Sequence, residues 1–174
     1  VVPRAPLTGQ FKETDWSPSV TLTWQPSRDV NVYGKFAEGA KGGAFSEFQA
    51  VTAATFILRP ETSKTYELGS KFSFPDVRGF LNLALFTTKY TDLQKSSLDI
   101  NTASFITSNA AGARTKGIEL DAGFRPTDAL RVSFAAAYLD ATYTSYPNGP
   151  CRFPTQVGCT TQDRSGDRIQ NSPK

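Results

Sequence analysis

Residues 113–146 read ARTKGIELDAGFRPTDALRVSFAAAYLDATYTSY, and this segment decides the fold of the chain. From Ile118 onward apolar side chains fall on alternate positions, with acidic residues between them. Successive side chains of a β-strand point to opposite faces, so this pattern predicts a strand with one apolar and one acidic face. Arg125–Asp128 then interrupts the alternation with turn chemistry, because proline fixes φ and aspartate bonds back to the backbone. The alternation resumes from Leu130 to Tyr138, which predicts a hairpin.

Each arm of this hairpin has about ten residues or more, a length typical of strands that cross a bilayer in a tilted barrel. In such a barrel the apolar face meets lipid and the polar face meets the lumen. Similar alternation predicts further strands at 20–24, 30–36, 63–74 and 80–90, and residues 166–174 could begin another. The predicted fold is therefore all-β, with about six antiparallel up-and-down strands that form part of a transmembrane β-barrel.

The connections between these strands alternate in length. Turns at Pro26, Pro75 and Pro126 lie 49 and 51 residues apart, so the repeating unit is a hairpin of about fifty residues. Long connections are predicted at 42–58, at 93–108 and after Tyr146. Outer-membrane barrels place short turns on one rim and long loops on the other. The alternative is a soluble β-sandwich that acts as a binding or adhesion module, but a sandwich has no reason to gather its long loops at one end.

Composition narrows the functional classes. The chain is 39% hydrophobic and 20% charged, which disfavours disorder, and its net charge of +3 is too small to indicate nucleic-acid binding. It has no histidine, the commonest general base and metal ligand, and no run of 18 apolar residues that could form a membrane-spanning helix. Methionine is also absent. We therefore expect a mature or internal portion of a longer protein.

The charges and aromatic rings follow the expected faces. A Lys or Arg that faces lipid at the bilayer midplane costs roughly 2–4 kcal/mol, so strand charges should face the lumen. The charged residues opposite the aromatic face are Lys35, Glu67, Lys71, Glu119, Asp121 and Arg131. Three aromatic residues lie close to the predicted short turns: Trp24, Phe74 and Phe124. Their position predicts an aromatic girdle at the periplasmic rim.

Several stretches together make the chain resemble the C-terminal barrel portion of TonB-dependent outer-membrane receptors of Gram-negative bacteria. The resemblance covers most of the chain, in the order found in that family: Trp16–Phe45, Arg59–Phe72, Leu81–Gln94, Ser108–Thr144 and Gly166–Lys174. It implies a 22-stranded barrel plugged by an N-terminal domain, and TonB-energised uptake of a scarce ligand such as a ferric siderophore or cobalamin. A passive porin is an alternative within the membrane class.

The sequence lacks parts that this family is expected to have. It contains neither a plug domain nor a TonB box, and about six strands cannot close a barrel of that class. We therefore expect residues 1–174 to be a segment of a receptor in the cell outer membrane. The expected partners are outer-membrane lipid, the remaining barrel and plug, TonB through the plug, and a ligand such as a ferric siderophore.

Two small motifs permit sharper hypotheses. Cys151 and Cys159 could form a disulfide or half of a metal site, and the absence of histidine and of other cysteines disfavours zinc. The oxidising exterior of such a receptor favours the disulfide. Glu119 and Asp121 lie about 6.6–6.8 Å apart on one strand face, a spacing that inverting glycosidases use. Solvated lumen acids are the favoured interpretation, so we expect no enzyme, no catalytic residue, no cofactor and no metal.

Overall fold

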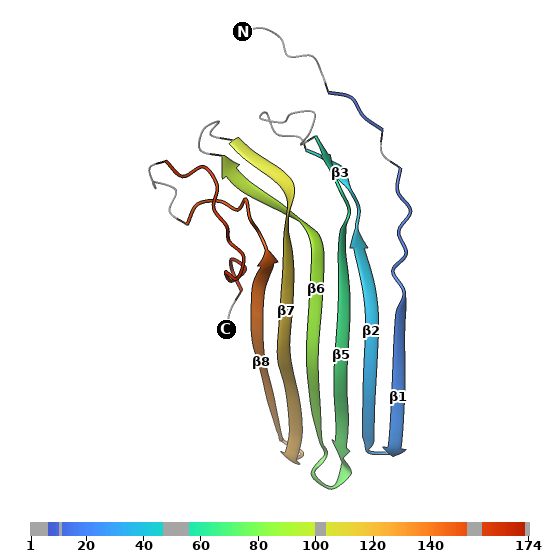
Figure 1. Cartoon of the computed structure of the whole chain (residues 1–174). Coiled ribbons are helices and arrows are strands. Elements are labelled where there is room, and N and C mark those ends of the chain that lie inside the picture. The colour runs from blue at the N-terminus through green and yellow to red at the C-terminus, as the bar shows by residue number, and fades with distance from the viewer. Residues whose placement is uncertain (1–6, 11, 47–55, 100–103, 153–157, 173–174) are drawn as a thin grey trace.

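The computed structural model describes residues 7–10, 12–46, 56–99, 104–152 and 158–172. Six strands form one antiparallel sheet in the order β1-β2-β5-β6-β7-β8, and the short strands β3 and β4 pair separately (Figure 1). The elements are β1 (Ser19–Ser27), β2 (Val30–Lys41), β3 (Ala44–Phe45), β4 (Ile57–Leu58), β5 (Glu61–Phe74), the 3₁₀ helix η1 (Pro75–Val77), β6 (Gly79–Asp99), β7 (Ser104–Thr127) and β8 (Leu130–Ser145). Each long strand pairs with the next one along the chain, which confirms the predicted all-β up-and-down fold. No helix among these residues is both long and apolar enough to cross a membrane.

The main sheet is a single layer. A β-sandwich would bury one face of each sheet against the other, about 10 Å away. Here Leu22 is 76% exposed, Leu68 is 55% exposed and Ile118 is 46% exposed. No large side chain among the described residues is fully buried. The β-sandwich alternative is therefore wrong.

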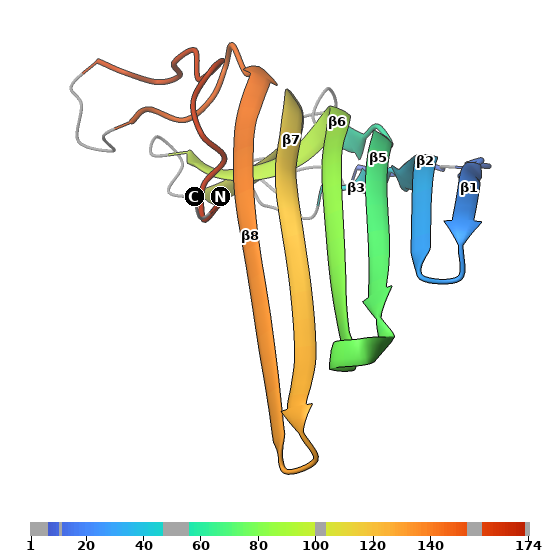
Figure 2. The same cartoon turned by 90° about the horizontal axis from the view of Figure 1, so that it is seen from below.

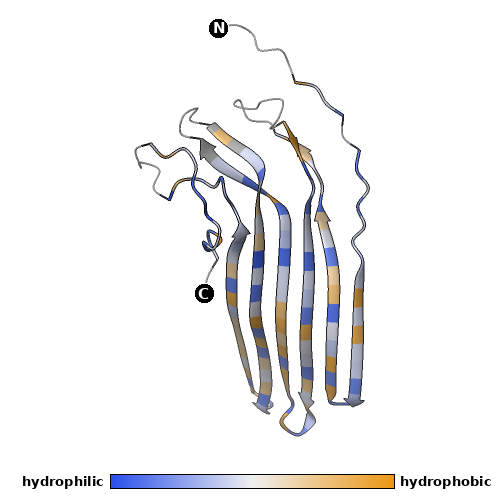
Figure 3. Cartoon of the chain, viewed as in Figure 1, coloured by the Kyte–Doolittle hydropathy of each residue, from blue (hydrophilic) through white to orange (hydrophobic). Residues whose placement is uncertain are grey.

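The strand register divides the side chains between two faces, because residues paired across neighbouring strands share a face. One line of paired residues crosses all six strands: Leu22, Gly34, Leu68, Leu85, Ile118 and Tyr138. The face that contains this line is here called the apolar face, and the opposite one the polar face. Figure 3 shows the resulting alternation of hydrophobic and hydrophilic residues along the strands.

The apolar face carries no charged residue in a band that starts at the short turns. The band reaches Phe36, Tyr66 and Thr87 on β2, β5 and β6, but it ends at Ile118 and Tyr138 on β7 and β8, where Lys116 and Asp140 follow on the same face. Its members are Val20, Leu22, Trp24, Val30, Val32, Gly34, Phe36, Tyr66, Leu68, Ser70, Phe72, Phe74, Gly79, Leu81, Leu83, Leu85, Thr87, Ile118, Leu120, Ala122, Phe124, Leu130, Val132, Phe134, Ala136 and Tyr138. Contiguous exposed apolar surface of this kind marks contact with lipid or another protein.

The short connections all lie at one end of the sheet, as predicted (Figures 1 and 2). The register slips just before two of them, between Trp24 and Ser27 and between Phe124 and Thr127. Each slip contains one of the prolines, at Pro26 and Pro126, because a residue without an N–H is tolerated where the hydrogen-bonded ladder is interrupted.

Successive hairpins are also offset from one another. Val30, the first residue of β2, pairs with Phe72, but β5 continues two residues further, to Phe74. The third hairpin extends beyond the second in the same direction, because Phe124 lies level with Gly79 and β7 continues to Thr127. A closed barrel requires such a regular offset between neighbouring strands.

Two of the long connections differ from the prediction. The expected connection at 93–108 is wrong, because β6 and β7 stay paired from Leu93 opposite Ala111 to Asp99 opposite Ser104. The stretch is rich in hydroxyl residues and lacks apolar alternation, but hydroxyls can pair across strands, as Ser96 and Thr107 do at 2.6 Å. The connection predicted at 42–58 contains the small β3–β4 hairpin.

The segment after Tyr146 is irregular, as expected. Its continuation at 166–174 does not form a full strand in the described part, where Thr142 and Arg168 make an isolated antiparallel bridge. The backbone N–H of Ile169 donates to Ala141 O at 2.9 Å. The segment therefore lies against the outer edge of β8.

Aromatic rings on the polar face lie over glycines in the neighbouring strands. Tyr33 pairs directly with Gly69, and a Cβ at Gly69 would lie 2.3 Å from Tyr33 Cζ. Phe86 covers Gly117 in the same way. The absence of a side chain at these glycines lets a ring lie flat on the sheet, a cross-strand arrangement that stabilises β-pairs.

We expect Gly69→Val to destabilise the intact protein by about 1–3 kcal/mol, because the added side chain overlaps the Tyr33 ring. Gly34→Val is the matched control, since nothing lies within 4 Å of a Cβ at Gly34. Thermal unfolding of the two variants measures the difference. Equal unfolding temperatures would show that the ring over Gly69 contributes nothing to stability.

Candidate functional site

The polar face is hollowed where β2, β5, β6, β7 and β8 lie side by side. The hollow has a volume of about 560 Å³. The polar and charged residues of the polar face that line it are Tyr33, Glu67, Lys71, Asn82, Glu119 and Asp121. Three carboxylates thus accompany one ammonium group, and the hollow is acidic.

Hydrogen bonds fix part of this lining. Tyr33 Oη donates to Glu67 Oε1 at 2.6 Å, and Lys71 Nζ lies 6.0 Å from the centre of the Tyr33 ring. Asn82 Nδ2 donates to Asp121 Oδ2 at 3.3 Å. Within the described residues no ion pair within 4.0 Å neutralises Glu67, Glu119 or Asp121. The hollow can therefore accept a cationic group.

The six charges predicted to face a lumen all lie on the polar face. Four of them line the acidic hollow: Glu67, Lys71, Glu119 and Asp121. Lys35 pairs in register with Glu67, but its side chain makes no ion pair with that carboxylate within 4.0 Å. Arg131 follows Leu130 on β8 and lies outside the hollow.

The three predicted girdle residues lie on the apolar face near the short turns. Trp24 is 66% exposed, and Phe74 and Phe124 are each 45% exposed. Phe74 ends β5, whereas the other two rings lie three residues before the ends of their strands. Their role in a membrane interface remains a prediction.

Sequence reasoning missed the supporting residues of the hollow. The alternation alone places Tyr33 on the polar face, but it cannot show that the ring crosses Gly69 to reach Glu67. Asn82 is likewise an ordinary strand residue until the register places it opposite Asp121. These contacts join residues more than thirty positions apart, so finding them requires the register between strands, which the alternation within one strand does not give.

At the other end of the sheet, polar side chains tie the long connections together. Asn109 Oδ1 accepts a bond from Arg59 N at 2.7 Å, and Asn109 Nδ2 donates to Arg59 O at 2.7 Å. Arg59 Nη2 also contacts Asp92 Oδ1 at 2.5 Å. The segment before β5 is thereby held against β6 and β7.

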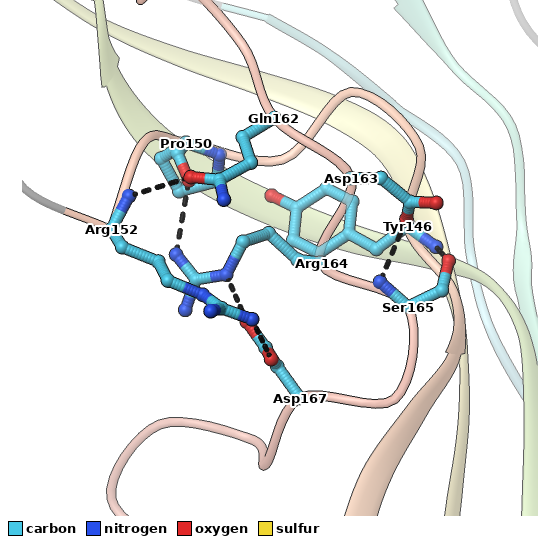
Figure 4. A network of polar contacts seen from close by, with 8 residues as sticks. All are labelled: Tyr146, Pro150, Arg152, Gln162, Asp163, Arg164, Ser165 and Asp167. Atoms are coloured by element: carbon cyan, nitrogen blue, oxygen red, sulfur yellow. Dashed lines mark hydrogen bonds and ion pairs between the residues drawn. The ribbon is translucent and has the colours of Figure 1, made fainter.

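The segment after β8 is closed by a disulfide between Cys151 and Cys159, whose Cα atoms lie 6.3 Å apart. Two guanidinium groups, from Arg152 and Arg164, meet on the carboxylate of Asp167 (Figure 4). Arg152 Nη2 lies 2.7 Å from Asp167 Oδ1.

Other contacts fasten this segment to the sheet. Tyr146 N donates to Ser165 Oγ at 2.8 Å, as Figure 4 also shows. The Tyr146 ring packs against Tyr143 in a small buried cluster. The described residues of this segment, 146–152 and 158–172, are therefore anchored to the sheet and to one another, and they are here called the cover.

We expect the cover after β8 to loosen in acid. Hydrogen bonds from Arg164 and Arg152 hold the pKa of Asp167 below its ordinary value of 3.8. A carboxyl with a lowered folded pKa contributes stability that is complete above its unfolded pKa and is lost as pH falls through the folded pKa. The protection of residues 158–172 against hydrogen exchange, expressed relative to the intrinsic exchange rate at each pH, should therefore fall below about pH 4.

Asp167→Asn should give the lower protection already at neutral pH and should reduce the acid dependence. The part that remains is due to Asp163, because hydrogen bonds from Ser165 also lower the pKa of that carboxyl. Asp76→Asn in the distant 3₁₀ helix is the control and should behave as the wild type. An unchanged exchange profile in Asp167→Asn would contradict the role of this carboxylate.

Comparisons with known proteins agree with this architecture. A family model described as TonB dependent receptor-like, beta-barrel, matches residues 3–174. The chain is 27% identical over 160 residues to a probable TonB-dependent siderophore receptor, PiuA of Acinetobacter baumannii. That match covers 88% of this chain and 20% of PiuA.

Solved structures share the fold. The structure of the siderophore receptor PiuA from Acinetobacter baumannii has a TM-score of 0.65 at 22% identity, over 90% of this chain and 22% of that one. The ferric yersiniabactin uptake receptor FyuA from Yersinia pestis has a TM-score of 0.57 at 24% identity, over 72% and 18%. The chain therefore spans about a fifth of the length of these relatives.

Proposed function

The chain belongs to the TonB-dependent receptor β-barrel family, and we propose that it is a segment of the barrel wall of an outer-membrane receptor. In this proposal residues 1–174 are one portion of a barrel whose other strands lie outside this sequence. The apolar face contacts outer-membrane lipid, and the polar face lines the lumen. The receptor imports a ferric siderophore with energy supplied through TonB.

One observation carries the proposal: an uncharged apolar band that spans six consecutively paired strands. At the level of this band the charged residues, among them Glu67, Lys71, Glu119 and Asp121, lie on the opposite face. Phe74 to Tyr66 on β5, for example, places only uncharged side chains on the apolar face, while Lys71 and Glu67 alternate with them. A band of this size is unfavourable in water, because burial of apolar surface stabilises a protein by about 25 cal/mol per Å². Lipid supplies that burial without a second protein layer.

The ligand class follows from the relatives. PiuA is described as a siderophore receptor, and FyuA as a receptor for ferric yersiniabactin uptake. A ferric siderophore is therefore the cargo that we propose for this receptor. The long connections and the disulfide-closed cover would lie on the extracellular side, since the short turns belong to the periplasmic rim.

The acidic hollow suggests how the wall holds a plug domain. A carboxylate that accepts from an ammonium or guanidinium group forms a charge-assisted hydrogen bond, which is shorter and stronger than a neutral one. We propose that a basic side chain of the plug binds between Glu67 and Glu119. Tyr33 supports this binding because its hydroxyl orients the Glu67 carboxylate.

Uptake of radiolabelled iron by iron-starved cells tests the function. We expect deletion of the gene that encodes the intact receptor to abolish uptake of at least one ferric siderophore from a panel, and deletion of TonB to have the same effect. Re-expression of the receptor should restore uptake. Unchanged uptake of every siderophore in the receptor deletion, with normal TonB-dependent uptake of other ligands, would contradict the proposal.

We expect Glu67→Gln with Glu119→Gln to loosen the plug, because both variants keep the side-chain shape but remove the charges that face the cation. In thermal unfolding of the intact receptor, the first transition, which we assign to the plug, should move to a lower temperature. The later transition of the barrel should keep its temperature. Asp76→Asn, in the exposed 3₁₀ helix, serves as the control. Identical first transitions in the double variant and the wild type would rule out the plug contact.

A further inference from the structure

We propose that the Cys151–Cys159 disulfide is a redox-sensitive clamp that keeps residues 159–169, here called the return limb, paired with the edge of β8. Reduction of this disulfide releases the return limb and opens the aromatic cluster that it packs against. The inference rests on the proposed function, which places the cover on the extracellular side, where oxidants and thiols can reach it. It uses no residue of the acidic hollow.

The cover is an irregular hairpin that continues β8. Residues 146–152 lead away from β8, and the return limb comes back antiparallel to them. Isolated bridges mark this pairing, Thr142 with Arg168 and Gly149 with Gln162. Backbone N–H groups of the return limb donate across the hairpin: Arg164 to Tyr146 O, Gly166 to Tyr143 O and Ile169 to Ala141 O. The last residues of the return limb therefore occupy the edge of β8.

The return limb has few apolar contacts that could hold it in this position. It reads CTTQDRSGDRI, in which Ile169 is the only large apolar residue. Ile169 packs against the small buried cluster that contains Tyr143 and Tyr146. Segments with few buried apolar contacts open locally at a low cost in free energy. The side chains alone therefore attach the return limb weakly.

The polar contacts of the return limb add little to this attachment. The ion pair between Arg164 and Asp167 lies within the return limb and moves with it. The ion pair between Arg152 and Asp167 does cross the hairpin, but the Arg152 side chain is 53% exposed. Exposed ion pairs contribute little to stability, because water screens them and two long side chains must be ordered. A further constraint is needed to keep the limb on β8.

The disulfide supplies that constraint at the outer end of the hairpin. Without it, the outermost bridge between Gly149 and Gln162 must close a connection of 12 residues, 150–161. The disulfide crosses this connection eight residues apart in sequence, with Cα atoms 6.3 Å apart. A cross-link of this kind removes conformations from the open state, so it favours the paired state. Oxidation therefore favours the closed cover, and reduction favours the open one.

The redox step is ordinary thiol–disulfide exchange, and both cysteines are half-buried rather than enclosed. To form the clamp, the Cys151 thiolate attacks the disulfide of an exchange protein and gives a mixed disulfide. The Cys159 thiolate then attacks the Cys151 sulfur and expels the thiolate of the exchange protein. The chain loses two electrons and two protons, and the exchange protein gains them as a dithiol. Two molecules of a small thiol reverse the step and leave as their own disulfide.

The test measures hydrogen exchange in the intact receptor at neutral pH, before and after reduction with a water-soluble phosphine. We expect reduction to lower the protection of the amide groups of Arg164, Gly166 and Ile169 about tenfold or more. Protection of Leu68 and Leu85, which pair in the β5–β6 ladder, should stay unchanged.

The double variant Cys151→Ser, Cys159→Ser should show the lower protection of the return limb without reductant. It also serves as the control for the reagent, because the phosphine should have no effect on it. If this variant does not reach the outer membrane, reduction of the assembled wild-type receptor still decides the question.

Two results would overturn the clamp. One is unchanged protection of the return limb after complete reduction, and the other is an equal loss of protection in the β5–β6 ladder, which would indicate general unfolding. Siderophore uptake tests the proposed function separately. Normal uptake with unchanged protection rejects only the clamp, whereas a return limb that loosens on reduction in a receptor that imports no siderophore rejects the proposed function and retains the clamp.

Discussion

Backbone hydrogen bonding between consecutive strands is the constraint on which this structure depends. A β-strand can lie in hydrocarbon only when its N–H and C=O groups are bonded to neighbouring strands, because no water is available to them. The β5–β6 ladder runs without a slip from Thr62 to Phe74. With the backbone satisfied within the sheet, side chains need no protein core and can divide between two different environments.

This division explains why the sheet has so little buried interior. The buried apolar cluster consists mainly of Ala111, Ala113, Tyr143 and Tyr146, where the segment after β8 folds back on the sheet. Elsewhere the polar face is stabilised by local pairs, such as the Tyr33 ring over Gly69 and its hydrogen bond to Glu67. The apolar face has no protein partner among the described residues, and lipid takes that place in the proposed receptor.

The features that follow from the two-residue repeat of side chains along a β-strand could be predicted from the sequence. Ile118 and Glu119 fall on opposite faces in any strand, so the alternation shows which side chains face which environment. Turn positions were also predictable, because Pro26, Pro75 and Pro126 cannot continue a ladder. The paired stretch beyond Leu93 was not, since hydroxyl residues alternate with no apolar signal. Contacts such as Asn82 with Asp121 depend on register, which a single strand does not encode.

The two faces of β5 can be compared directly in a bilayer. Nitroxide labels placed one at a time from Tyr66 to Phe72 in the membrane-reconstituted receptor report collision rates with oxygen and with a water-soluble nickel chelate. The proposed arrangement predicts that oxygen collisions dominate at Leu68 and Phe72, and chelate collisions at Glu67 and Lys71, with a period of two residues. Uniform accessibility along the strand, or chelate collisions that peak at Leu68 and Phe72, would contradict the lipid-facing assignment of the apolar band.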